Sequence, residues 1–172
     1  MKDSFDQLVT CHSKDALEAY DQAVDCQLHA WPGALASVDL ALKHAPDFAL
    51  AHSARALLLH SSGRGGEARE ASKHALALAK AVTEREQSHV RIINLMLEGR
   101  SAAALQNVRT HAEQWPLDAL VISLALGAFG LIAFSGRADH DQERFDFVQT
   151  LNPQYPSDHP WLLSHRGWVL IE

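Results

Sequence analysis

Gly63-Arg64, Gly99-Arg100 and Gly136-Arg137 repeat one dipeptide at intervals of 36 and 37 residues. An interval of this size is typical of helix-turn-helix repeats, whose period is near ~34 residues. Glycine commonly ends a helix because it adopts a left-handed backbone conformation without a steric penalty. The dipeptides therefore predict an all-α chain in which the first helix of a unit ends at each glycine.

Three prolines keep the same interval, because Pro46 and Pro116 are 70 residues apart and Pro153 follows 37 residues later. Proline stops a helix since it lacks the backbone N–H and its ring clashes with the preceding turn. We therefore predict a right-handed α-solenoid of antiparallel helix pairs. Residues 1–12 form a polar lead-in, and residues 13–172 form a single domain of about four helix pairs plus the first helix of a fifth.

Local signals place the individual helices. Ser13 is expected to cap a helix that runs to about His29, and Asp47 to cap the helix that ends at Gly63. Thr83 and Glu86 fit a capping box at the start of the helix that ends at Gly99. Further helices are expected over about 34–45, 66–80, 119–134 and 138–151, and from Trp161 to Glu172. Another helix after Gly99 is expected to carry Ala104, Leu105, Val108 and Ala112 and to end at Trp115-Pro116.

The composition is that of a compact chain, with 47% hydrophobic and 21% charged residues. A net charge of −6 gives no electrostatic reason to expect nucleic acid or an anionic membrane as a partner. The apolar stretch 119–134 is shorter than the ~20 residues that cross a bilayer. Cys11 and Cys26 are expected to be reduced thiols, and without an apparent signal peptide we expect a cytoplasmic protein.

No catalytic or metal-binding motif is recognisable, so we expect a chain that is not an enzyme and holds no cofactor or metal. The eleven histidines contain no His-Glu-x-x-His pattern, and His52, His74 and His111 are interpreted as polar-edge residues on packed helices. The stretch 61–66 lacks the strand and the Lys-Ser/Thr of a phosphate loop. Ser88 and His89 are neighbours on a helix, so their side chains diverge by about 100°.

Longer strings carry a resemblance to a known family. Pro46-Asp47-Phe48-Ala49-Leu50-Ala51-His52, residues 83–90 and Trp115-Pro116-Leu117-Asp118-Ala119-Leu120 resemble the N-terminal half of the tetratricopeptide repeat protein 38 family, bacterial branch. The resemblance covers roughly residues 13–172. It implies a long all-helical solenoid of which this chain is an N-terminal portion, and it implies no particular reaction.

Solenoids of this type offer a concave surface built from the first helix of each unit. The phase of the repeats assigns a mostly apolar candidate groove to Leu50, Ser53, Leu57, His60, Glu86, His89, Ile93 and Met96. The same concave face begins at Ala16, Ala19, Ala23 and Cys26 and continues over Ser123, Leu126, Gly130 and Ala133. Our first hypothesis is therefore a non-enzymatic scaffold that binds a protein or peptide segment. This hypothesis leaves two alternatives for the groove. Either downstream repeats fill it, or it is open to an apolar peptide.

A second hypothesis is an enzyme or small-ligand protein, with His60, Glu86 and His89 as its polar cluster. The C-terminal sequence Trp168-Val169-Leu170-Ile171-Glu172 is apolar and lacks a partner helix after it. We therefore expect self-association through the C-terminal helix.

Overall fold

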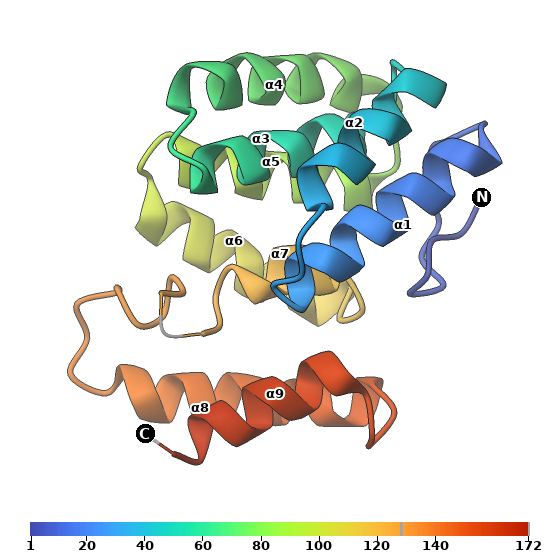
Figure 1. Cartoon of the computed structure of the whole chain (residues 1–172). Coiled ribbons are helices and arrows are strands. Elements are labelled where there is room, and N and C mark those ends of the chain that lie inside the picture. The colour runs from blue at the N-terminus through green and yellow to red at the C-terminus, as the bar shows by residue number, and fades with distance from the viewer. Residues whose placement is uncertain (128, 172) are drawn as a thin grey trace. The chain divides into compact units, whose positions relative to one another are not determined.

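The computed structural model describes residues 1–127 and 129–171 (Figure 1). The chain divides into two compact units, Met1–Arg100 and Ser101–Glu172. Nine α-helices and two short 3-10 turns account for the regular structure of the described residues. Their only β feature is an isolated antiparallel bridge between Lys2 and Leu8, so the all-α prediction is confirmed for this part of the chain.

The first unit contains five of the helices. They are α1 (Lys14–Leu28), α2 (Ala34–His44), α3 (Ala49–Ser61), α4 (Gly65–Leu78) and α5 (Glu84–Leu97), with the 3-10 turn η1 (Ala79–Ala81) after α4. Consecutive helices pack against each other, α1 with α2 and α3 with α4, and α3 also packs against α2 and α5. This arrangement of neighbouring pairs is compatible with a helical repeat.

The predicted turns at Gly63 and Gly99 are confirmed. Both glycines have positive φ angles, +75° and +73°. After Gly63 the Arg64 N–H donates to Leu59 O, and after Gly99 the Arg100 N–H donates to Leu95 O, each at 2.9 Å. This is the hydrogen-bond pattern of a Schellman cap, in which the left-handed residue lets the chain return to the last free carbonyls of the helix.

Two of the three predicted N-caps are also confirmed. The Ser13 hydroxyl accepts from the Ala16 N–H, and Thr83 forms the complete capping box with Glu86. Asp47 does not cap α3, because the N-cap is Phe48 and no side chain accepts a bond there. Phe48 is instead buried and lies with its ring centroid 5.0 Å from that of Tyr20.

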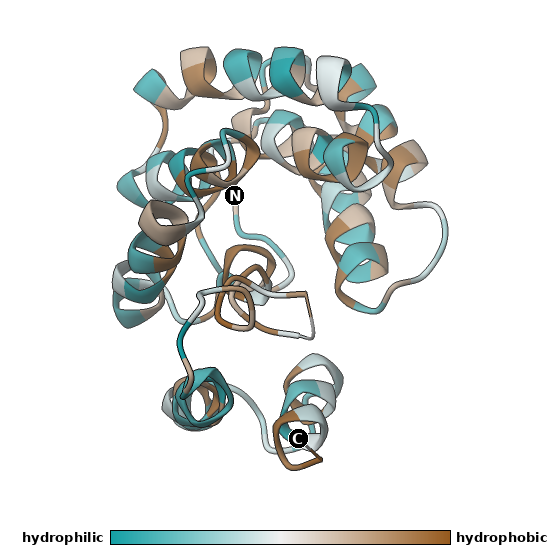
Figure 2. Ribbon diagram, turned by 90° about the vertical axis from the view of Figure 1, so that its left-hand side faces the viewer, coloured by the Kyte–Doolittle hydropathy of each residue, from teal (hydrophilic) through white to brown (hydrophobic). Residues whose placement is uncertain are grey.

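Small residues allow α3 and α4 to approach closely. Ala56 and Leu59 of α3 form a buried cluster with Ala68 and Ala71 of α4. Several helices of the first unit carry both hydrophobic and hydrophilic residues, seen as brown and teal along their ribbons (Figure 2). The apolar positions can therefore face this core while the polar ones meet solvent.

Ala68→Leu is expected to lower the free energy of unfolding by about 1–3 kcal/mol, because the added carbons have no space in this contact. Ala77→Leu is the matched control, since Ala77 is exposed on the same helix. Urea unfolding followed by circular dichroism measures both. Equal stabilities for the two variants would contradict the assigned phase of α4.

The second unit contains α6 (Ser101–Gln114), α7 (Ala119–Ser123), α8 (His140–Leu151), the 3-10 turn η2 (Asn152–Gln154) and α9 (Pro160–Val169). Helix α6 packs against α7, and α8 packs against α9. Trp161 of α9 is fully buried, and its ring centroid lies 5.3 Å from that of Tyr155. The Tyr155 hydroxyl donates to Pro116 O at 2.9 Å, which ties the end of α6 to the α8–α9 connection.

The predicted helix over 119–134 is wrong. Helix α7 ends at Ser123, and Gly127 has a φ of +80°. The chain then folds back, because the Leu131 N–H donates to Leu124 O at 2.8 Å. The buried guanidinium of Arg144 donates to Gly127 O at 3.0 Å and holds this loop from α8.

Three further expectations fail in this unit. Gly136 has a φ of +77° but follows an irregular loop, so it does not end a helix. His111 is not a polar-edge residue, because it is buried with its Nε2 3.1 Å from Asp118 Oδ2. The final helix ends at Val169, and Glu172, the predicted last residue of that helix, lies outside the described residues.

No helix among the described residues is long and apolar enough to span a membrane.

Candidate functional site

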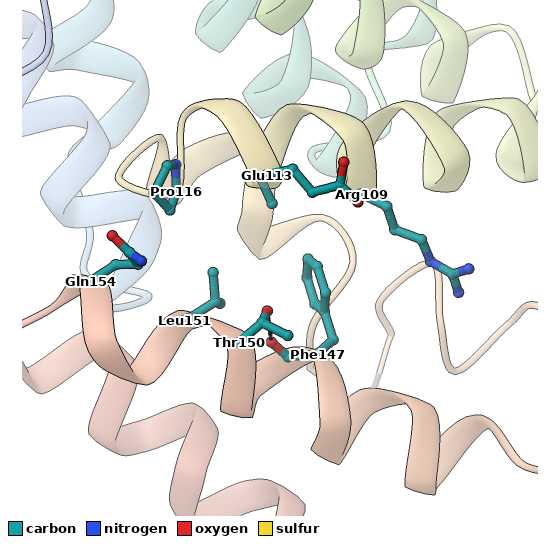
Figure 3. A pocket seen from close by; sticks show the side chains of 8 residues that line it. Arg109, Glu113, Pro116, Phe147, Thr150, Leu151 and Gln154 are labelled. Atoms are coloured by element: carbon teal, nitrogen blue, oxygen red, sulfur yellow. Dashed lines mark hydrogen bonds between the residues drawn. The ribbon is translucent and has the colours of Figure 1, made fainter.

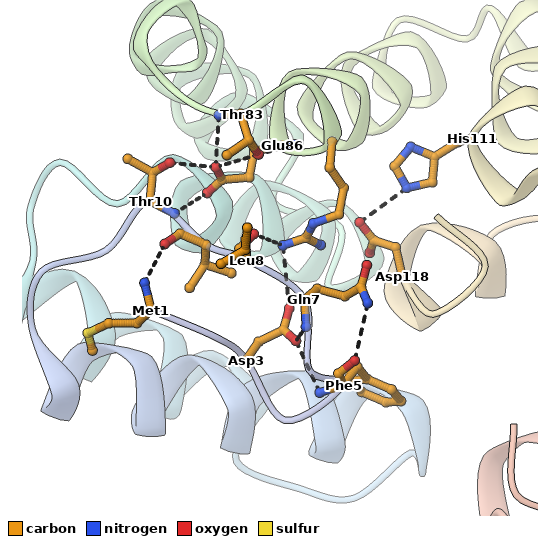
Figure 4. Close-up of polar contacts among 12 residues, drawn as sticks. Met1, Asp3, Phe5, Gln7, Leu8, Thr10, Thr83, Glu86, His111 and Asp118 are labelled. Atoms are coloured by element: carbon orange, nitrogen blue, oxygen red, sulfur yellow. Dashed lines mark hydrogen bonds and ion pairs between the residues drawn. The ribbon is translucent and has the colours of Figure 1, made fainter. Parts of the chain in front are cut away.

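The first ten residues form an ordered hairpin-like loop beside α1 (Figure 4). The Met1 amine donates to Val9 O, and the Val9 N–H donates back to Met1 O at 2.9 Å. At the tip, the Asp3 carboxylate accepts the N–H groups of Phe5 and Gln7. The polar lead-in is therefore folded onto the helices of its unit.

Glu86 anchors this segment to α5. Its side chain is fully buried and accepts four hydrogen bonds. Thr10 donates its N–H to Oε1 at 2.8 Å and its hydroxyl to Oε2 at 2.6 Å. Thr83 donates its N–H and its hydroxyl to Oε2 at 3.0 and 2.8 Å. Burying a carboxylate without hydrogen-bond partners destabilises the folded state. The four donors offset this penalty for Glu86.

Arg85, the preceding residue, holds the same segment at two further points. Its guanidinium donates to Leu8 O at 3.0 Å and to Asp3 Oδ2 at 3.4 Å. Both side chains of the Arg85–Asp3 pair are buried. Charge-assisted hydrogen bonds of this kind are stronger than neutral ones. Helix α5 therefore holds the N-terminal segment with two adjacent charged side chains, the cationic Arg85 and the acidic Glu86.

Asp21 of α1 lies near the segment, where Ser4 and the charge of Asp3 influence its carboxylate. Burial raises the pKa of Asp21 to about 6, and the nearby charges of Asp3 and Glu18 add to the increase. The N-terminal segment is therefore hydrogen-bonded to α5 and lies near Asp21 of α1.

The raised pKa of Asp21 predicts a pH dependence of stability. An acid with a raised folded-state pKa favours the folded state below its unfolded value near 3.8, and that advantage is lost as pH rises through 6. Asp21→Asn should raise the free energy of unfolding by about 1 kcal/mol at pH 7.5, allowing for solvent screening, and leave it unchanged at pH 3.5. Urea unfolding at both pH values tests this. An equal effect at the two values would contradict it.

The residues of the predicted groove are mostly inaccessible. Leu50, Ser53, Leu57, Glu86, His89 and Ile93 are buried, Met96 is partly buried, and only His60 is exposed. Glu86 and His89 therefore do not form an accessible polar edge together with His60. The predicted continuation over Ser123, Leu126, Gly130 and Ala133 does not form a helix face, because α7 ends at Ser123.

The sequence interpretation missed Thr10, Arg85 and Asp3. It assigned Glu86 to the capping box with Thr83 and to an open groove beside His60 and His89, and it gave Glu86 no partner in the N-terminal segment. The sequence Val9-Thr10-Cys11 carries a signal for this segment, because a polar residue stands between two apolar ones. In the structure Val9 and Cys11 are each 4% exposed, and Thr10 between them is less buried. Alternation of this kind is typical of extended chain with one buried face.

A pocket of about 380 Å³ lies in the second unit between α6 and α8 (Figure 3). Phe147 and Leu151 of α8 and Ala112 of α6 line its apolar part, and Arg109 and Glu113 lie at its polar part. Arg109 forms an ion pair with Glu143 of α8. The Arg109 guanidinium, which could recognise an anion, is therefore already paired with a carboxylate of α8.

The histidines do not gather into a metal site. Within the described residues there is no group of three or more His, Cys, Asp or Glu side chains that could hold an ion. His52 and His74 have ring centroids 4.3 Å apart, and His52 Nε2 lies 2.8 Å from Pro46 O. Burial lowers the pKa of His52, which favours its neutral form. Cys11 and Cys26 are both buried free thiols.

Comparison of the chain with protein-family models, with curated proteins and with solved structures gives no match.

Proposed function

We propose that this protein is a non-enzymatic interaction scaffold whose first unit binds an extended protein segment along α1 and α5. The observation that supports it most is the N-terminal segment itself. Glu86 accepts the Thr10 N–H, and Arg85 donates to Leu8 O. These are contacts to the main chain of an extended segment, and main-chain contacts of this kind recur in proteins that bind peptides.

We also propose the repeat type and the handedness of the fold. The neighbouring helix pairs and the matching caps at Gly63 and Gly99 support a right-handed solenoid of tetratricopeptide type, as in the protein 38 family. A cytoplasmic location belongs to the same proposal. The groove, on this account, is filled first by the protein's own residues 1–11, in addition to any downstream repeats.

The alternative of an enzyme or small-ligand site at His60, Glu86 and His89 is less well supported. Both Glu86 oxygens are occupied by donors from Thr10 and Thr83, and its side chain has no solvent-exposed surface. A general base or ligand-binding carboxylate must reach its substrate. Glu86 meets this condition only if the N-terminal segment leaves.

Binding in trans tests the proposed function. The full chain carrying Thr10→Glu places a second carboxylate against Glu86 and should displace the segment. A labelled peptide of residues 1–12 should then bind this variant, measured by fluorescence anisotropy, and bind the unaltered chain at least tenfold more weakly, because the tethered segment competes at roughly millimolar effective concentration. The absence of binding to the folded variant would contradict the proposal.

Self-association through the C-terminal helix is a separate expectation. Trp168, Leu170 and Ile171 are 44%, 74% and 84% exposed, and Figure 2 shows hydrophobic colour at this end of the ribbon. Exposed apolar residues that lie together favour association. Sedimentation equilibrium should show dimers or larger species that Trp168→Lys with Ile171→Lys reduces. A strict monomer at all concentrations would contradict this expectation.

A further inference from the structure

We propose that Glu86 makes the inner surface of the first unit, the part of α1 and α5 next to residues 1–11, selective for a segment that carries serine or threonine, flanked by small apolar residues. This inference rests on the proposed function and specifies the chemistry of the partner. The bound N-terminal segment is its template, with Thr10 as the residue that is recognised.

Thr10 offers two hydrogen-bond donors to Glu86. The two carboxylate oxygens accept the N–H and the hydroxyl of the same residue, Thr10, at 2.8 and 2.6 Å. An ionised carboxylate is only an acceptor, so it matches a residue that presents two donors at one position. Serine and threonine do so. Valine has the shape of threonine but leaves Oε2 without the hydroxyl donor, and an acidic residue repels the carboxylate.

The flanking residues define the rest of the pattern. Val9 and Cys11, on either side of Thr10, are both buried, so these positions accept small apolar side chains. Leu8 is 63% exposed while its carbonyl accepts from Arg85. The side chain at that position can therefore vary, whereas its main-chain oxygen has to accept the hydrogen bond from Arg85.

The occupant also has to displace the protein's own segment. A buried carboxylate that loses donors is destabilised, so the surface favours an occupied state. A partner with serine or threonine at the Thr10 position replaces both lost donors, whereas a partner without a hydroxyl replaces only one. The N-terminal segment is therefore a tethered competitor. A partner segment displaces it more readily when that partner carries a hydroxyl at the Thr10 position.

Peptide competition tests this selectivity. The acceptor is the full chain with Thr10→Glu, and the probes are labelled peptides of residues 1–12 with threonine, serine or valine at position 10. The threonine and serine peptides should bind with similar Kd, and the valine peptide at least about tenfold more weakly, as expected for loss of a hydrogen bond to a charged group. Adding Glu86→Gln to the acceptor should reduce the difference between threonine and valine peptides, because the amide offers a single acceptor oxygen.

The outcomes separate the two proposals. Equal binding of all three peptides to a folded acceptor would overturn the hydroxyl selectivity and leave the binding function standing. Failure of every peptide to bind a folded acceptor would overturn the binding function itself. Circular dichroism establishes that the acceptor is folded, and the full chain with Thr10→Val serves as a second acceptor if Thr10→Glu unfolds.

Discussion

Glu86→Ala is expected to lower the free energy of unfolding of the first unit by about 3–5 kcal/mol, since it leaves buried donors unpaired and a cavity behind. The side chain is fully buried and joins Thr10 to Thr83, so the variant loses both the capping box and the anchor of the N-terminal segment. Urea unfolding followed by circular dichroism measures the loss.

Glu84→Ala is the matched control for this effect. Glu84 lies in the same first turn of α5 but is exposed, so its removal should cost less than about 1 kcal/mol through the helix dipole alone. If Glu86→Ala proves as mild as Glu84→Ala, Glu86 is not the buried anchor described above.

Gly130→Ala is expected to destabilise the second unit by about 3 kcal/mol. A Cβ atom at this position would lie 2.1 Å from Leu126 O and 2.6 Å from Ala125 O. Both neighbours are backbone atoms, so no side-chain rotation relieves the clash. The backbone at Ala125 and Leu126 has to move, which disturbs the buried Ile132 of the same loop.

Gly66→Ala provides the opposite case. Gly66 lies in α4 and a Cβ atom there has no neighbour within 4 Å. Alanine should therefore stabilise the helix by up to about 1 kcal/mol, because it restricts the unfolded chain and favours the helical backbone. Thermal unfolding of both variants separates steric clash from propensity. A neutral Gly130→Ala would contradict the packed loop.

The sequence predicted those elements whose structure depends on local chemistry. The caps at Ser13 and Thr83 and the turns at Gly63 and Gly99 need only a few neighbouring residues, and all four are confirmed. The small residues of α4 identified its buried face for a similar reason, because helical periodicity places them on one side.

The missed elements depend on contacts between distant residues or on a balance of opposing preferences. In 119–134, apolar content favoured a buried helix while Gly127 and Gly130 opposed it, and the buried Arg144 side chain supplies a bond to the loop from α8. The N-terminal segment was missed because Thr10 meets Glu86 across 76 residues of sequence. Neither relation is visible in a periodic pattern.

Hydrogen exchange at the Thr10 amide tests most directly whether the N-terminal segment occupies the inner surface of the first unit. The Thr10 N–H donates to the buried Glu86 carboxylate, so in the full chain it should exchange at least about 100-fold more slowly than in the free peptide of residues 1–12. Exchange at the rate of the free peptide would show that the segment is not bound, and would contradict the account.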